Sequence, residues 1–235
     1  VRVGEKAGDG TLAPLVAAGG LLLDVDGTSG TLTLNAPIVD IGGTVVVKKY
    51  GSGEAVLPNS STYSGATTIY EGTLLAQHAN ALGTTAAGTT VNSNAVLELA
   101  GGITTPAEAL TLIGTLSSQT GANTFAGAIT PSYGSWIDVG PASLLIVSGS
   151  TAGAGGFTKT GTGTLRLNAD PNQSGLYTIN AGTLELNHSG TTDAPITIAP
   201  GAMLRELSVN DLNDAMSVTN NGTFDMRTSD TMGML

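Results

Sequence analysis

The sequence predicts an all-β fold, a β-solenoid whose coils each take roughly 20 residues. The prediction rests on a short unit at residues 178–186, on the recurrence of that unit along the chain, and on composition. In this unit Ile179, Leu184 and Leu186 are apolar, and polar residues alternate with them on either side of Ala181-Gly182. Such a pattern is typical of two short strands that meet at a tight corner.

The same corner unit recurs along the chain. Its central apolar residues lie roughly 20 residues apart where units follow one another, which is the period of stacked coils. They are Ile69, Val91, Ile179, Ile198 and Val218. We predict that these residues point into the core with Leu74 and Leu184, and that Gly72 and Gly182 take positive φ at the corners. Each central apolar residue is preceded by a threonine or serine, and we predict that these polar residues form one outward column. They are Thr68, Thr90, Thr178, Thr197 and Ser217.

Composition favours a narrow core. The 235 residues include 34 glycines and no cysteine, with 4% aromatic and 11% charged residues. Large side chains are too few for one thick core, whereas stacked coils need only ladders of Leu, Ile, Val and Ala, with small polar residues and glycine at the corners. At about 20 residues per coil, the chain has room for about ten or eleven coils.

A longer repeat lies over the coils. One constant offset in numbering places Lys49, Gly72 and Leu74 on Lys159, Gly182 and Leu184, and no gap is needed. The chain therefore predicts two copies of one multi-coil module inside a single continuous solenoid over residues 1–235. We place the modules at about residues 20–125 and 126–207, followed by an atypical tail at 208–235.

Taken in order, residues 1–20 are rich in Gly and Ala and predict a weak first coil. Residues 21–27 alternate apolar and polar positions before the turn at Asp26-Gly27, and strands at 30–34 and 44–47 follow. A glycine-rich corner at 49–53 and a loop at 58–61 lead to the first corner unit. Between the modules, Pro106 favours a solenoid loop over a helical turn.

Charge limits the predicted partners. The formal net charge is −10 and the pI is near 4.3, and the chain has no cluster of Lys and Arg. Nucleic acids and anionic membrane surfaces are both bound through such clusters, so neither is a predicted partner. No apolar run reaches transmembrane length, so we predict no membrane insertion by this segment.

The two modules resemble a known family. The sequence Phe-Thr-Lys-Thr-Gly-Thr-Gly-Thr-Leu at 157–165, with Ser174-Gly175 and residues 178–184, resembles the autotransporter-associated β-strand repeat of secreted bacterial passenger regions. Residues 49–53, 63–65 and 68–74 resemble it in the first copy, and residues 121–127 resemble a flanking element. The first copy departs from the pattern at Glu54-Ala55, and the second at Gln173.

The resemblance covers roughly residues 20–207 and fits poorly beyond them. It implies a right-handed parallel β-helix, an extracellular or cell-surface location and a part in passenger secretion. It implies no catalytic residue and no cofactor.

Few residues are candidates for chemistry. Trp136 is out of phase with Ile137, so it is predicted to point outward, either as a glycan contact or under a loop. Asp24 and Asp26 share one strand face about 6.5 to 7 Å apart, near the spacing of an inverting glycosidase pair. An outward Asp-x-Asp before a glycine turn is more typical of a solvated strand end, and no third acid or Arg adjoins it in sequence. The remaining candidates are His78 and His188, at matching module positions. About five coils separate these histidines, so they predict surface loop positions and no shared metal.

These observations lead to three functional hypotheses. The first is a non-enzymatic extracellular structural solenoid, a stalk, spacer or fibre-forming unit that associates end to end with itself. The second is an adhesin module that binds a cell-surface glycan through Trp136 or the loop at 58–61. The third is a polysaccharide-cleaving enzyme that uses Asp24 and Asp26. No metal or cofactor is predicted for any of them.

Overall fold

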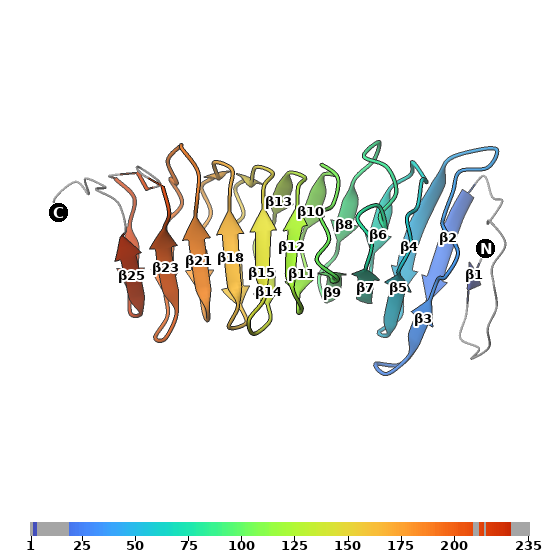
Figure 1. Ribbon diagram of the computed structural model, residues 1–235, viewed down its shortest axis with the longest axis horizontal. Coiled ribbons are helices and arrows are strands. Elements are labelled where there is room, and N and C mark those ends of the chain that lie inside the picture. The colour runs from blue at the N-terminus through green and yellow to red at the C-terminus, as the bar shows by residue number, and fades with distance from the viewer. Residues whose placement is uncertain (1, 4–18, 209–211, 214, 227–235) are drawn as a thin grey trace.

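The computed structural model describes residues 2–3, 19–208, 212–213 and 215–226 of the chain. In these residues all regular secondary structure is β-strand, wound into coils that stack along one long axis to form a rod (Figure 1). The predicted first coil at residues 1–20 and the end of the tail fall largely outside the described residues. The all-β solenoid predicted from the sequence is confirmed.

Three parallel sheets form the sides of the rod. Sheet A contains β1 (Arg2–Val3), β2 (Gly19–Asp24), β4 (Val45–Tyr50), β6 (Thr67–Ile69), β8 (Thr89–Val91), β10 (Leu110–Leu112) and β13 (Ile129–Pro131). Sheet B contains β3 (Thr31–Thr33), β5 (Glu54–Leu57), β7 (Gly72–Ala76), β9 (Ala95–Leu99), β11 (Thr115–Ser118), β14 (Ser135–Val139), β17 (Phe157–Thr160), β20 (Tyr177–Ile179), β22 (Ile196–Ile198) and β24 (Val218–Asn220). Sheet C contains β12 (Ala122–Phe125), β15 (Leu144–Val147), β18 (Thr164–Leu167), β21 (Thr183–Leu186), β23 (Met203–Glu206) and β25 (Thr223–Met226). A short pair, β16 (Ala152–Gly153) and β19 (Asn172–Gln173), stands apart from them.

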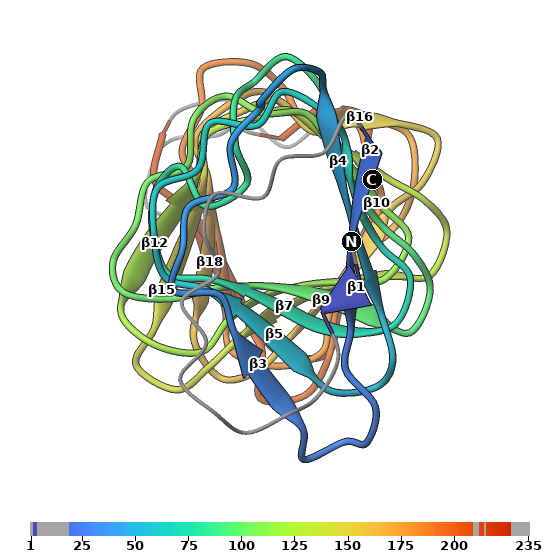
Figure 2. The ribbon, with the colours of Figure 1, turned by 90° about the vertical axis from the view of Figure 1, so that its right-hand side faces the viewer.

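The coils wind in a right-handed sense. Figure 2 looks along the rod with its N-terminal end toward the viewer, and the chain passes from sheet A on the right to sheet B below and returns over the left and top. Because this path is clockwise while the chain recedes, the solenoid is right-handed. Neighbouring strands within each sheet run parallel, which agrees with the parallel β-helix that the resemblance implied.

Apolar ladders fill the inside of the rod. In sheet B, Leu74, Leu97, Leu116 and Ile137 follow one another in register, and each is at most 1% exposed. The other inward positions belong to the same core: Ile69, Val91, Ile179, Leu184 and Ile198 are buried, and Val218 is half-buried. At roughly 25 cal/mol for each Å² of apolar surface removed from water, such ladders are the main stabilising contribution of every coil.

The long repeat does not correspond to a whole number of coils. From Val47, five successive pairings through Thr67, Thr89, Leu110 and Ile129 lead to Thr151. The equivalent of Val47 in the second copy is instead Phe157, which lies beyond Thr151, on the next side of the rod. As a result β4 and β5 of the first copy lie in sheets A and B, whereas their equivalents β17 and β18 lie in sheets B and C.

This rotation overturns the prediction of one outward threonine column. Thr68 and Thr90 are paired in sheet A, whereas Thr178 and Thr197 are paired in sheet B. In the tail the register also differs, because Thr219 and not Ser217 pairs with Thr197. Val218 accordingly pairs with Ile196, two residues before the predicted equivalent. The prediction was wrong because it assumed coils of equal length, whereas loop lengths vary between coils.

The glycine corners place backbone against backbone. Gly72 has φ of 64° and Gly182 has φ of 67°. A Cβ on Gly182 would overlap the carbonyl oxygen of Gly163 in the preceding coil, and a Cβ on Gly72 would overlap that of Gly53. Both a left-handed backbone and a close approach therefore require glycine at these two corners.

Gly182→Val is expected to lower the free energy of unfolding by at least about 2 kcal/mol, because it adds a steric overlap to the strain of positive φ. Gly201→Val is the matched control, since Gly201 has φ of 81° but open space around its Cβ direction. Urea denaturation followed by circular dichroism measures both. Equal losses at the two sites would mean that backbone strain alone, and not the approach of neighbouring coils, selects glycine.

Candidate functional site

A buried lysine closes the corner of each module. Lys49 and Lys159 are both 0% exposed and occupy inward ladder positions, between Leu23 and Ile69 and between Ile137 and Ile179. Lys49 Nζ donates to the carbonyl oxygens of Tyr50, Gly51 and Glu71 at 2.8, 2.7 and 3.2 Å. We call this arrangement the lysine cage.

The second module repeats the lysine cage on a different side of the rod. Lys159 Nζ donates to the carbonyl oxygens of Thr160, Gly161 and Ala181 at 2.6, 2.7 and 3.2 Å. Each ammonium thus has three acceptors for its three protons, two from its own corner and one from the next coil. Desolvation lowers the pKa of Lys159 to about 8, although nearby Asp138 acts in the opposite direction.

The lysine cage was not predicted from the sequence, although a signal for it was present. Val45, Val47 and Lys49 alternate with outward residues, so parity alone places Lys49 inward. Polar and charged residues are rarely assigned to a core, because the energetic cost of burying a charge is large unless it is paired or hydrogen-bonded. The carbonyls of the glycine corner supply those hydrogen bonds. The cage is therefore a structural device that joins two coils.

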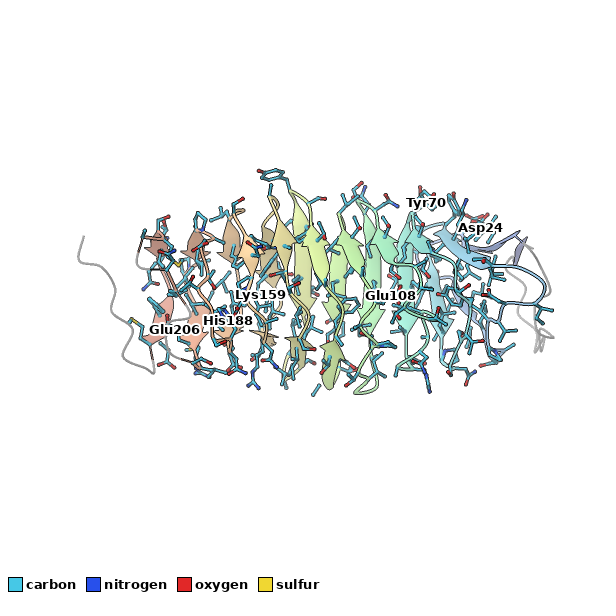
Figure 3. The ribbon with its side chains drawn as sticks, turned by 90° about the horizontal axis from the view of Figure 1, so that it is seen from above. Asp24, Tyr70, Glu108, Lys159, His188 and Glu206 are labelled. Carbon is cyan, nitrogen blue, oxygen red and sulfur yellow. The ribbon has the colours of Figure 1, made fainter. Side chains whose placement is uncertain are left out.

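A second buried polar cluster lies in the first module. The hydroxyls of Tyr63 and Thr67 share a hydrogen bond of 2.6 Å, and the Thr89 hydroxyl donates to Glu108 Oε1 at 2.6 Å. Glu108, which Figure 3 labels, is only 3% exposed. Desolvation raises the pKa of its carboxyl to about 7, an effect that the hydrogen bond from Thr89 partly opposes.

Glu108 should make stability fall as pH rises. Its folded-state pKa lies above its unfolded value, so its contribution is fully present below about pH 4.5 and is lost as pH rises through about 7. Glu108→Gln is expected to raise the free energy of unfolding by about 3 kcal/mol at pH 8 and to leave it unchanged at pH 4. Urea denaturation of both proteins from pH 4 to 8 measures this difference. A difference that does not vary with pH would contradict the burial of an ionisable carboxyl.

Trp136 lies on the outer face of β14 and is 44% exposed. It is paired with Thr115 and Thr158 in neighbouring coils. Tyr133 and Leu176, also exposed, line a hollow of about 200 Å³ that includes Thr158. The sequence did not reveal this hollow, because Leu176 comes from two coils beyond Tyr133.

Asp24 and Asp26 line one shallow hollow on sheet A, with Lys48 and Tyr50 from the next coil. Asp24 is half-buried and Asp26 is exposed. The acid of a glycosidase pair is typically enclosed by apolar groups, whereas in the part of the chain that the structure describes the two aspartates share an open hollow with the charged Lys48 and Glu71.

The two histidines have different surroundings, and the structure does not bring them together. His78 is half-buried in the loop after β7. His188 is 4% exposed, and its Nδ1 lies 2.9 Å from the carbonyl oxygen of Gly190 and 3.4 Å from Asp170 Oδ1. The prediction of a surface position was wrong for His188, because its ring turns inward beneath the loop that carries Gly190. Among the described residues no group of three or more His, Asp or Glu side chains is placed to hold a metal ion.

Sheet C carries a charge ladder that the sequence reasoning missed. Arg166, Glu185, Arg205 and Asp225 follow one another in register on successive strands. Arg166 Nε lies 2.8 Å from Glu185 Oε2, and Arg205 Nε lies 2.9 Å from Asp225 Oδ2. The alternation of charge sign at intervals close to one coil was the available signal. Opposite charges in neighbouring coils favour this register over a slipped one.

The fold and the lysine-capped corners define a repeat protein of the right-handed β-solenoid class. Residues 47–76 and 157–186 match the family model described as passenger-associated-transport-repeat. These two segments contain the two lysine-cage corners, and they are equivalent parts of the two copies of the long repeat. The match confirms the resemblance to autotransporter-associated repeats.

A curated relative extends the similarity beyond the two corners. Over 164 residues, 69% of this chain, the sequence is 34% identical to the adhesin BmaC autotransporter of Brucella suis biovar 1 (strain 1330). The chain spans only 4% of the length of that protein. No solved structure matches the chain. These similarities indicate a passenger segment of a secreted, cell-surface protein of the autotransporter type, with passenger-associated-transport repeats at residues 47–76 and 157–186.

None of the described residues forms a helix of the length and apolarity that crossing a membrane requires.

Proposed function

We propose that this chain is a non-catalytic spacer, a rigid segment that sets distance within a surface passenger region. The observation that carries the proposal is the unbroken ladder of sheet B, in which ten strands follow one another in register. Such a stack advances about 4.8 Å per coil, so ten coils span about 45 to 50 Å. Each coil contacts only its neighbours, which lets length change in whole coils without a change in fold.

The spacer role is tested by changing the number of coils. Residues 110–128 make one coil, because Leu110 and Ile129 occupy successive positions of the same ladder. Two fluorophores are attached to a surface-displayed chain, one before the altered coil and one beyond β25. Removing these residues should shorten the distance between the fluorophores by about 5 Å, and duplicating them should lengthen it by about 5 Å. Removing residues 110–119, half a coil, is the matched control and should disrupt the fold. A fluorophore distance that does not follow whole-coil changes would contradict a rigid spacer.

Adhesion is the second candidate role, and the exposed side chain of Trp136 favours it. The similarity to a protein named an adhesin also supports it. Cell-surface binding that is lost in Trp136→Ala, with an unchanged melting temperature, would assign adhesion to the surface around Trp136. Binding that persists in this variant would place it elsewhere.

Catalysis and fibre formation have their own tests. Release of reducing ends from a polysaccharide, lost in Asp24→Asn with Asp26→Asn, would replace the spacer role with an enzymatic one. The predicted end-to-end contact involves residues 1–3 at one end and Met226, Met232, Met234 and Leu235 at the other. Val1 and the last three of these lie outside the described residues, whereas residues 2–3 pair with β2 and Met226 is exposed. Electron microscopy across a concentration series distinguishes a fibre-forming unit from a spacer, since a spacer should remain monomeric.

A further inference from the structure

The corner of the first module carries an aromatic stack on its outer surface. Tyr50 ends β4, and Tyr70 lies one coil further on, next to Ile69 of β6. The two rings are stacked, with centroids 4.4 Å apart and planes inclined by 10°. Asp24 precedes Tyr50 in the same column, and Asn92 follows Tyr70. Figure 3 shows Asp24 and Tyr70 along the same edge of the rod.

A hollow lies on each side of this stack. The first hollow, about 570 Å³, is lined by Asp24, Asp26, Lys48 and Tyr50. The second, also about 570 Å³, is lined by Tyr70, Asn92 and Asn94. Glu71 lines both hollows, which therefore adjoin each other beside the stack. We call these two adjoining hollows the tyrosine groove.

Each tyrosine gives one ring face to its partner, and each also lines one of the two hollows, together with its column neighbour Asp24 or Asn92. Tyr50 is half-buried and Tyr70 is 36% exposed, which holds the rings in place without covering them. The aliphatic face of a pyranose ring packs on an aromatic face, while its hydroxyls need hydrogen-bonding groups around the rim. Carboxylates of Asp24 and Glu71 and the amide of Asn92 supply such groups.

We propose that the tyrosine groove binds a neutral oligosaccharide, with one sugar ring on each side of the Tyr50–Tyr70 stack. Among the described side chains that line the first hollow, the three carboxylates of Asp24, Asp26 and Glu71 outnumber the one ammonium of Lys48, which disfavours an anionic glycan. This binding site goes beyond the spacer role and does not depend on it. It is also separate from Trp136, which lies on β14.

The second module provides an internal control for the groove. At the positions of Tyr50, Tyr70 and Glu71 it has Thr160, Asn180 and Ala181, around the same lysine cage. The backbone corner thus folds with either set of side chains. Tyr50→Thr with Tyr70→Asn therefore removes the stack while introducing only residues that this corner already accepts.

The test uses the full chain and three tetrasaccharide probes in calorimetry and saturation-transfer NMR. Cellotetraose and chitotetraose are the neutral probes, and tetragalacturonate is the anionic one. We expect at least one neutral probe to bind and tetragalacturonate not to bind. Tyr50→Thr with Tyr70→Asn should weaken binding at least tenfold while the melting temperature stays within a few degrees. Trp136→Ala should leave the affinity unchanged.

Three results would overturn the proposal. The first is the absence of binding by both neutral probes. The second is binding that survives Tyr50→Thr with Tyr70→Asn, or that is lost in Trp136→Ala, because either places the sugar elsewhere. The third is tetragalacturonate binding as tightly as a neutral probe. None of these results bears on the distance measurements that test the spacer role.

Discussion

Lys159→Met is expected to lower the free energy of unfolding by about 3 kcal/mol. The substitution keeps the aliphatic stem in the ladder but removes the donor to three carbonyl oxygens, those of Thr160, Gly161 and Ala181. A buried acceptor left without a partner typically costs about 1 to 3 kcal/mol. Methionine carries no charge, so the variant avoids the desolvation penalty of a buried ammonium. The net loss is therefore smaller than the summed cost of three acceptors without a donor.

The matched comparisons use the first module. Lys49→Met should have a similar effect, because Lys49 has the same three kinds of acceptor in its own corner. Lys48→Met changes an exposed lysine one residue earlier and should alter stability by no more than about 0.5 kcal/mol. Guanidinium denaturation followed by circular dichroism measures all three. If Lys159→Met and Lys48→Met had equal effects, the three carbonyls would be solvated and the cage would not join the coils.

Fold class and coil period could be predicted because both depend on local pattern. The inward positions of a short strand are apolar, glycine marks the corners, and the pattern returns every coil. Recognising these three features does not require knowing the exact length of each loop. The handedness came only from the resemblance to a family, since alternation is the same for either hand.

The sequence did not predict which residues of distant coils share a column, because small differences in loop length add up from coil to coil. The tyrosine groove joins Asp24, Tyr50, Tyr70 and Asn92, whose intervals along the sequence are unequal. A constant period of roughly 20 residues would align Tyr50 with Tyr70 and would miss the other two. Differences in loop length also explain why equivalent strands of the two modules lie on neighbouring sides of the rod. A gap-free alignment of the two copies does not reveal this rotation, because an alignment shows which residues are equivalent and not which side of the rod they occupy.

Buried polar residues were the other failure of sequence reasoning. Lys49, Glu108 and His188 were not assigned to the interior, because each has a charged or polar side chain and a surface position is the usual expectation. Their burial depends on acceptors or donors supplied by a neighbouring loop or coil. Such partners are known only once the register between coils is known.

The inward register of the ladders is tested by a pair of aspartate substitutions. Leu116→Asp is expected to destabilise the rod by several kcal/mol, because it places an unpaired carboxylate between the buried Leu97 and Ile137. Thr115→Asp, one residue earlier on the half-buried outer face, is the control and should cost less than about 1 kcal/mol. Equal shifts in melting temperature would mean that the strand register is off by one residue.

Ile179→Asp is expected to be milder than Leu116→Asp, and the reason is the lysine cage. Ile179 is 0% exposed, but its neighbour in the preceding coil is Lys159. An aspartate there would introduce its negative charge beside a buried ammonium, and attraction at low effective dielectric offsets part of the desolvation. The difference between the two variants should therefore shrink when Lys159→Met is added to Ile179→Asp. A double-mutant cycle with coupling below about 0.5 kcal/mol would contradict the position of Lys159 inside the ladder.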